Sequence, residues 1–359
     1  MLNITKIQKE LKKLKVDAFL VSKPENIYYL SNFKGSFGLI LATKKIPYLI
    51  TDSRYIFEAK KVAPAKFTVL KTSKTFNKNI ESFLKKRKIK KIGFEADSLT
   101  ITKLKNIKKL AKVSFKPLLN TVEKHREIKN QEEIGKIQKA QQICDKILKD
   151  IRRSFKTGVT ENEISWKIKQ LAHKYGIDEL SFPTIVAFGK NSATPHHQTS
   201  DKKLKKGDII LIDMGVKYKN YNSDITRVFF TKRPSKNVEK IYNTVLACQQ
   251  KAISKLSTRI TAKNLEQHVR NFLIKKKLNR NFCHSLGHGV GLEIHENPTV
   301  SYSNNQKFKK GHIFTIEPGL YFENSYGIRI EDVVLIDGKK IKILSRSPKD
   351  LEKVIIDIK

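Results

Sequence analysis

The sequence has little of what secreted or membrane proteins are built from. Its three cysteines, Cys144, Cys248 and Cys283, lie far apart and form no CxxC pair. This spacing indicates neither a disulfide framework nor a cysteine zinc site. No apolar run approaches the roughly 20 residues of a membrane helix, and the N-terminus has no apolar centre typical of a signal peptide. We therefore expect a soluble, cytoplasmic chain without a membrane partner.

Acidic residues are few beside the basic ones, with 34 Asp and Glu against 73 Lys and Arg, so the net charge is +39. A charge of this size is usual in proteins that bind nucleic acids. However, 61 of the basic residues are Lys and only 12 are Arg, whereas base and phosphate recognition favours Arg. The charge is also spread along the chain, with 29 basic and 9 acidic residues among 1–125. We therefore expect no nucleic-acid partner.

The length of 359 residues and the hydrophobic fraction of 39% indicate about two domains with packed cores. In the first part, helical and strand patterns alternate. The expected elements are a helix at 4–15, strands at 16–21, 39–42, 47–51, 67–70 and 91–95, a turn at 22–26 and a helix at 77–86. This order predicts an α/β domain over 1–122. A long helix over 127–154 opens the second domain, which covers 127–359.

The second domain contains an internal duplication. Residues 204–216 match residues 308–320 at an offset of 104, and the helical segment that starts at Ile137 matches the one at Ile241 at the same offset. This period is too long for a solenoid, whose units have about 20–50 residues. The pattern instead predicts two copies of a helix–helix–strand–strand unit around a pseudo-twofold axis, with a cleft between the halves.

Four carboxylates occupy corresponding places in this duplication. Asp213 and Glu317 end apolar strands, and Asp224 and Glu331 lie on the return strands. Strand alternation puts Arg329 on the same face as Glu331. Buried carboxylates need a cation or a hydrogen-bonded partner, and two divalent cations would neutralise four of them. A histidine completes such a set when a transition metal is preferred; the candidates are His284, His288 and His295.

Five segments of the second domain resemble the pita-bread metallopeptidases, specifically the Xaa-Pro peptidase branch (aminopeptidase P and prolidase). They are ATPHH, LIDMGVKYKNYNSDITR, HSLGHGVGLEIHENP, TIEPGLY and GIRIEDVVLI. The segments ENIYYLSNFKGSFGLIL and YLITDSRY resemble the creatinase-like N-terminal domain of that branch. The resemblance covers nearly the whole chain. It implies an α/β (α+β) fold with a creatinase-like N-terminal domain and a pita-bread catalytic domain.

The resemblance also implies a site for two divalent metal ions. Its ligands are Asp213, Asp224, His288, Glu317 and Glu331. Asp224 and Glu331 are the implied bridging residues, Asp213 completes one metal site, and His288 and Glu317 complete the other. Manganese fits the dominance of carboxylates best, and cobalt or zinc is the alternative.

Four further side chains are implied on the substrate side, namely His196, His284, His295 and Arg329. His197 is the alternative to His196, because a misassignment by one residue is open. Two metal ions make a shared water more acidic. Glu317 is the candidate for moving a proton to the leaving nitrogen, and His196 or His295 for stabilising the oxyanion.

The implied activity is that of a metallo-exopeptidase that cleaves Xaa-Pro bonds in proline-containing peptides. The main interpretation is an Xaa-Pro aminopeptidase, and the alternative is an Xaa-Pro dipeptidase (prolidase). A dipeptidase needs a cation for the C-terminal carboxylate of its substrate, and 61 lysines do not single one out. A non-catalytic pita-bread protein that binds peptides or nucleic acid is a remote alternative, since such proteins typically lose metal ligands. The resemblance further implies a homodimer.

Overall fold

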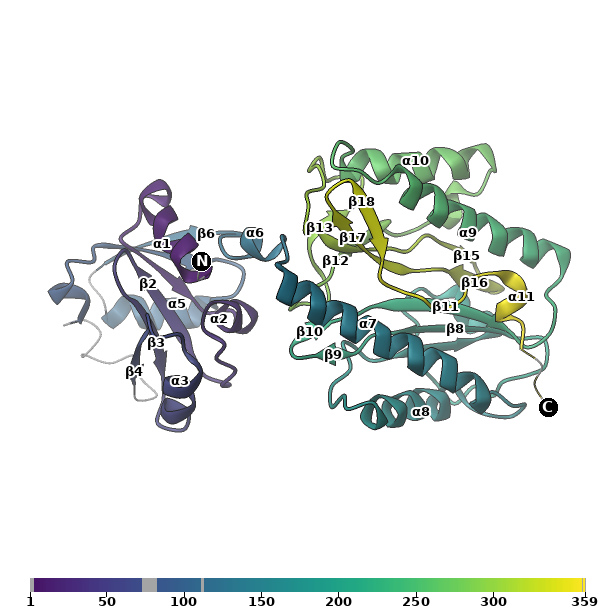
Figure 1. Ribbon diagram of the computed structural model, residues 1–359, viewed down its shortest axis with the longest axis horizontal. Coiled ribbons are helices and arrows are strands. Elements are labelled where there is room, and N and C mark those ends of the chain that lie inside the picture. The colour runs from purple at the N-terminus through teal and green to yellow at the C-terminus, as the bar shows by residue number, and fades with distance from the viewer. Residues whose placement is uncertain (1–2, 73–82, 111–112, 357, 359) are drawn as a thin grey trace. The chain divides into compact units, whose positions relative to one another are not determined.

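The computed structural model describes residues 3–72, 83–110, 113–356 and 358. It divides into two compact units, Met1–Arg126 and Glu127–Lys359, each with its own hydrophobic core (Figure 1). Both units mix helices with strands, as the sequence predicts. Within the described ranges, no helix has the length and apolarity to cross a membrane.

The first unit is built on a six-stranded mixed sheet with the order β4-β3-β2-β1-β5-β6. Its strands are β1 (Ala18–Val21), β2 (Leu39–Thr43), β3 (Pro47–Thr51), β4 (Thr68–Lys71), β5 (Lys91–Glu95) and β6 (Ser114–Leu118). Strands β1, β2 and β3 are antiparallel neighbours, whereas β4, β5 and β6 join in parallel. The five expected strands are confirmed, and β6 was not predicted.

The helices of this unit are α1 (Asn3–Leu14), α2 (Pro24–Ser31), α3 (Ile56–Val62), α5 (Ile101–Leu110) and α6 (Glu123–Arg126). Helix α1 buries Ile4, Ile7 and Leu11, which lie three or four residues apart on one face. The helix expected at 4–15 is thereby confirmed. Of the helix expected at 77–86, residues up to 82 lie outside the described residues, and 83–86 are helical.

The turn expected at 22–26 is wrong, because helix α2 begins at Pro24. Proline is well suited to the first position of a helix, where its fixed φ is helical and its missing N–H is not needed. The helix ends at Asn32, whose φ of 61° is left-handed. A Pro–Glu–Asn sequence is typical of turns as well as of helix starts, and the apolar residues after it decide between the two.

The second unit contains two similar series of elements. The first series is α7 (Gln131–Ile151), α8 (Glu161–Lys174), β7 (Ile185–Phe188), β8 (Ile209–Met214), β9 (Lys217–Tyr218), β10 (Tyr221–Asn222) and β11 (Ile225–Phe230). The second is α9 (Lys236–Lys255), α10 (Ala262–Lys275), β12 (Gly287–Gly289), β13 (Glu296–Val300), β14 (Ile313–Ile316), β15 (Gly319–Phe322), β16 (Tyr326–Arg329), β17 (Asp332–Asp337), β18 (Lys340–Ile343) and α11 (Leu351–Val354).

The sheets confirm the predicted duplication. The order β11-β8-β7 in the first half corresponds to β17-β14-β12 in the second, within a sheet of order β13-β12-β14-β17-β18. All these pairs are antiparallel. Bridges from Thr160 to Lys203 and from Thr261 to Lys307 also correspond. In Figure 1 the pairs α7–α8 and α9–α10 lie on opposite sides of the strands.

The long helix expected at 127–154 is shorter than predicted. It begins after Asn130, whose side chain accepts a hydrogen bond from the backbone of Glu133, while the Glu133 side chain accepts one from the backbone of Asn130. This capping box satisfies two free N–H groups and fixes the start of α7. At the other end, residues 152–154 form a 3₁₀ turn. Apolar periodicity alone could not locate either boundary.

Candidate metal centre

Two antiparallel strand pairs, one from each half, bring four carboxylates together. Asp213 lies in β8, and Asp224 directly precedes β11, which pairs with β8. In the second half, Glu317 directly follows β14, and Glu331 directly precedes β17, which pairs with β14. Because each pair is antiparallel, the end of one strand lies beside the start of the other. Each half therefore presents two carboxylates at one end of its strand pair.

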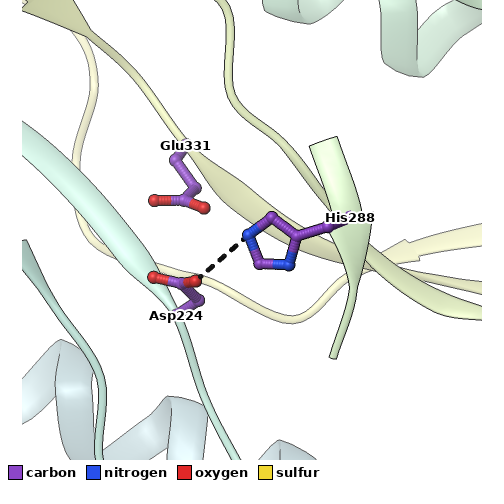
Figure 2. A group of neighbouring side chains, drawn as sticks. All are labelled: Asp224, His288 and Glu331. Carbon is purple, nitrogen blue, oxygen red and sulfur yellow. Dashed lines mark ion pairs between the residues drawn. The ribbon is translucent and has the colours of Figure 1, made fainter. Parts of the chain in front are cut away.

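His288 joins these carboxylates from β12. One ligand atom each of Asp224, His288 and Glu331 lies within 4.8 Å of the others, and Figure 2 shows the three side chains pointing toward one another. Nε2 of His288 lies 3.5 Å from Asp224 Oδ2 and 3.3 Å from Glu317 Oε1. Nδ1 lies 3.1 Å from the carbonyl oxygen of Gly289 and donates to it. This contact leaves Nε2 with its lone pair toward the carboxylates.

Glycines flank His288 because its strand runs close to other backbone. A Cβ on Gly287 would lie 2.0 Å from the carbonyl oxygen of Thr315, and one on Gly289 would lie 2.4 Å from that of Asn297. No side chain fits at such distances. The glycines therefore allow the approach that puts the His288 ring among the carboxylates.

Two threonines, which the sequence analysis missed, hold the glutamates. Thr226 Oγ1 donates to Glu331 Oε2 at 2.7 Å, and Thr315 Oγ1 donates to Glu317 Oε1 at 3.0 Å. Thr315 also accepts a hydrogen bond from the backbone N–H of His288 at 3.0 Å. Because Thr315 lies two residues before Glu317, strand alternation could have identified it. The contact of Thr226 with Glu331 joins the two halves and has no local sequence signal.

The electrostatics of the cluster fit bound cations. Burial raises the pKa of Asp224 and of Glu331 well above the usual range, and repulsion between the carboxylates adds to this. Burial also raises the pKa of Glu317 to about 7. Oδ1 of Asp213 and Oδ1 of Asp224 are buried without a hydrogen-bond partner in the described part of the chain. Buried anionic oxygens without donors, together with one imidazole, suit divalent transition metals.

Arg329 contacts both halves around the cluster. Its Nη2 lies 2.6 Å from Asp213 Oδ2, and its Nε donates to Thr226 Oγ1 at 3.0 Å. Its Nη1 donates to the hydroxyl of Tyr321 at 2.7 Å and to the carbonyl oxygen of Pro195 at 3.3 Å. Arg329 and Glu331 both contact Thr226, so the two side chains share one face as predicted.

His295 and His284 lie beside the cluster in different ways. The ring of His295 lies 4.2 Å from that of His288 between centroids, at an angle of 74°. Burial lowers the pKa of both His295 and His284 to about 4. Nδ1 of His284 lies 2.8 Å from the carbonyl oxygen of Ser285, and Nε2 lies 3.1 Å from the Tyr321 hydroxyl. Both ring nitrogens of His284 thus have protein partners.

The neighbouring histidines His196 and His197 have separate environments. Nε2 of His197 lies 2.8 Å from Glu161 Oε2, on the scaffold side. His196 is exposed, and its ring is not tied to Glu161 as that of His197 is. This difference favours His196 over His197 as the candidate for the substrate side.

Comparisons with known proteins show the family to which this fold belongs. Residues 135–338 match the model of metallopeptidase family M24, and residues 3–128 match that of the Creatinase/Prolidase N-terminal domain. An Xaa-Pro dipeptidase of Pyrococcus horikoshii is 35% identical over 350 residues, which cover 97% of this chain and 98% of that protein.

Two solved structures are also similar to this chain over nearly its whole length. An Xaa-Pro dipeptidase from Bacillus anthracis has a TM-score of 0.95 at 32% identity, with 99% of each chain covered. An X-Pro aminopeptidase from Thermotoga maritima has a TM-score of 0.88 at 34% identity, with 96% of this chain and 99% of that chain covered.

Fold and site together define a pita-bread metallopeptidase, a hydrolase that works with divalent metal ions. The chain belongs to metallopeptidase family M24 and carries the Creatinase/Prolidase N-terminal domain. The family, fold class and enzyme class expected from the sequence are thereby confirmed.

Proposed function

We propose that the protein is an Xaa-Pro dipeptidase (prolidase), which hydrolyses the bond before proline in dipeptides. The carboxylate–histidine cluster on a duplicated frame is the observation that carries this proposal. The sequence analysis put the Xaa-Pro aminopeptidase first and the dipeptidase second. Similarity to the Pyrococcus horikoshii and Bacillus anthracis dipeptidases, the latter with the TM-score of 0.95, favours the reverse order.

In this proposal, two divalent ions bind to Asp213, Asp224, His288, Glu317 and Glu331. Asp224 and Glu331 would be shared by both ions, Asp213 would complete one site, and His288 with Glu317 would complete the other; the 3.3 Å distance between these last two supports their pairing. When bound, the ions polarise the scissile carbonyl and acidify a water. Manganese is the first choice because carboxylates dominate, and cobalt or zinc is the alternative.

Glu317 is the proposed proton carrier. Its side chain is 16% exposed, compared with 6% for Asp224, so a substrate reaches it more easily. Asp213 has a similar exposed fraction of 15%, but Arg329 already binds its Oδ2. The nitrogen of a prolyl amide has no N–H and must receive a proton as it leaves. In this proposal, a Glu317 carboxyl oxygen holds that proton.

The proposed substrate side comprises His196, His295, His284 and Arg329. His196 and His295 donate N–H groups to the developing oxyanion, since neither has a fixed side-chain acceptor among the described residues and the His295 ring lies against that of His288. Arg329 acts mainly on Asp213, Thr226 and Tyr321, which it already contacts. His284 contributes through its ring face and through Tyr321, because both its nitrogens are engaged.

Hydrolysis of Ala-Pro and of Ala-Pro-Ala tests the proposal. Metal-free protein is reloaded separately with Mn²⁺, Co²⁺ or Zn²⁺, and kcat/KM is measured for both peptides. We expect kcat/KM to be at least about tenfold higher for Ala-Pro. The opposite preference identifies an aminopeptidase. If protein that holds two metal ions cleaves neither peptide, it is not an Xaa-Pro peptidase of either kind. The non-catalytic alternative is then favoured.

We also propose that the protein works in the cytoplasm as a homodimer. Free cysteines support a reducing compartment, since Cys144, Cys248 and Cys283 form no disulfide. The homodimer rests on the family resemblance. Light scattering after gel filtration is expected to give twice the chain mass of 41.3 kDa; a mass of one chain contradicts the dimer.

A further inference from the structure

Glu161, the first residue of α8, is fully buried and binds one loop with both carboxylate oxygens. It accepts hydrogen bonds from Phe188 N, Asn191 Nδ2, Ser200 N and Ser200 Oγ, at 2.6–3.0 Å. The 2.8 Å contact with His197 Nε2 is the fifth. A carboxylate can only accept here, so Nε2 of His197 carries the proton and donates it. Residues 188–200 are thus fastened at several points to the start of one helix.

His196 lies in this loop between two fastened neighbours. On one side, the carbonyl oxygen of Pro195 accepts a hydrogen bond from Arg329, which also binds Asp213. On the other side, the His197 ring is held by Glu161, and the His197 N–H donates to Thr194 O at 3.2 Å. The His196 ring makes no hydrogen bond of its own within the described residues. Its direction is therefore set by the backbone on either side.

We propose that His197 is a positioning residue that, through Glu161, holds the His196 ring in the direction that the reaction needs. The inference rests on the proposed function, in which His196 contacts the substrate. A group displaced by about 1 Å can lose 10²-fold in rate, and a ring on exposed backbone gains rotational freedom when its neighbour is released. The Arg329 contacts with Pro195 and Asp213 also connect this loop to the cluster.

A double-mutant cycle tests this inference. The kcat and KM for Ala-Pro are measured on the metal-loaded wild type, His196→Ala, His197→Ala and the double variant, together with metal content and Tm. His197→Ala is expected to lower kcat about tenfold, with a smaller change in KM and two metal ions still bound. In the His196→Ala background, the same change is expected to alter kcat/KM less than about twofold, because its effect passes through His196.

Three matched variants separate positioning from packing. His197→Gln keeps an N–H donor that reaches Glu161 and is expected to retain kcat within about threefold of the wild type. His197→Phe keeps the ring volume without the donor, and is expected to behave like His197→Ala; it also serves if the alanine variant does not fold. Gln198→Ala changes the exposed next residue and is expected to leave kcat unchanged.

The outcomes distinguish the inference from the function on which it depends. If His197→Ala lowers kcat/KM by the same factor in both backgrounds, or has no effect, His197 does not act through His196 and the inference is wrong. If His196→Ala itself leaves kcat/KM unchanged while Ala-Pro is still cleaved, the assigned role of His196 is wrong, and the inference is wrong with it. If the wild type cleaves no Xaa-Pro peptide, the proposed function fails first.

Discussion

Each half of the catalytic unit holds a loop that carries a histidine, but the two halves use different side chains to do so. In the first half, Glu161 on α8 binds the following loop directly and also takes the His197 ring. In the second half, Glu266 on α10 binds Arg270 at 2.6 Å and accepts a hydrogen bond from the backbone N–H of Leu286 at 3.4 Å, while Arg270 donates to the carbonyl oxygen of His284 at 3.2 Å. Each second helix thus uses a buried glutamate to hold a loop that carries a histidine proposed for the substrate side. The two halves share the arrangement of helices and strands and the use of a buried glutamate to hold a loop, but the residues that make these contacts differ.

The halves also differ in what they give to the cluster. The first half provides two aspartates, Asp213 and Asp224, and the second provides two glutamates, Glu317 and Glu331, together with His288. The longer side chains are the ones held by threonine hydroxyls. A glutamate has one more rotatable bond than an aspartate, so a hydroxyl donor is more useful in fixing its carboxylate. This asymmetry suggests several experiments.

The largest effect is expected from Glu331→Gln, compared with Asp224→Asn in the other half. In the proposed site, each change removes a charge that both cations would share, and kcat/KM for Ala-Pro should fall by about 10³-fold or more. Without metal, the same changes should raise Tm, since they remove repulsion among buried carboxylates. Activity assays and thermal unfolding with and without chelator check this. A fall in the Tm of the metal-free variants would show that the cluster is not repulsive.

Glycine substitutions should have opposite effects on stability in strand β12, which carries His288, and in helix α7. Gly287→Ala is expected to reduce the free energy of unfolding by about 3–4 kcal/mol, because its Cβ meets backbone at 2.0 Å. Gly135→Ala, in α7 with nothing within 4 Å, should increase it by about 1 kcal/mol. Urea unfolding of both variants measures this. Equal effects would mean that the strand yields and that the close approach is not required.

Two buried groups, one in each unit, should contribute to stability with opposite pH dependence. Burial lowers the pKa of His312 to about 4 in the second unit, so its contribution to stability is present above about pH 6.5 and lost as the pH falls toward 4. Burial raises the pKa of Glu95 to about 7 in the first unit, so its contribution to stability is present below about pH 4.5 and lost as the pH rises to 7. Each swing is about 3 kcal/mol at most.

Calorimetry between pH 4.5 and 8 measures these opposite slopes as two transitions. His312→Gln should flatten the acid side of one transition, and Glu95→Gln should flatten the neutral side of the other. A single transition with one slope, unchanged in both variants, would rule out the two buried groups as the cause.

The smallest effect concerns Tyr321, which connects Arg329 with His284. Tyr321→Phe removes one acceptor from the guanidinium and one donor from the imidazole, and should lower kcat/KM for Ala-Pro about tenfold. Metal content should stay the same, because Arg329 keeps its contact with Asp213. Steady-state kinetics with metal analysis checks this, and loss of a metal ion would place Tyr321 nearer to the ligands than the hydrogen bonds indicate.

What could be predicted from the sequence is what repeats or alternates along it. The apolar spacing in α1 and five of the six strands of the first sheet follow from local patterns, and the offset of 104 between Asp213 and Glu317 follows from the match of two segments. The contacts of Thr226 with Glu331 and of Arg329 with Pro195 join residues more than 100 positions apart. Contacts between residues so far apart leave no periodic pattern in the sequence. The same limit kept His197 open as the alternative to His196, because their difference lies in Glu161, a residue 36 positions from His197.

The contacts across the repeat also mean that each half orients a carboxylate of the other half. Thr226 of the first half orients Glu331 of the second, while Arg329 of the second half holds Asp213 of the first. Neither half on its own contains a finished set of ligands. A chain cut between β11 and α9 would yield two fragments that regain the cluster only by reassociating, so uptake of metal would report how tightly the fragments bind each other. In a chain cut in this way, cation binding would therefore require the two halves to recognise each other.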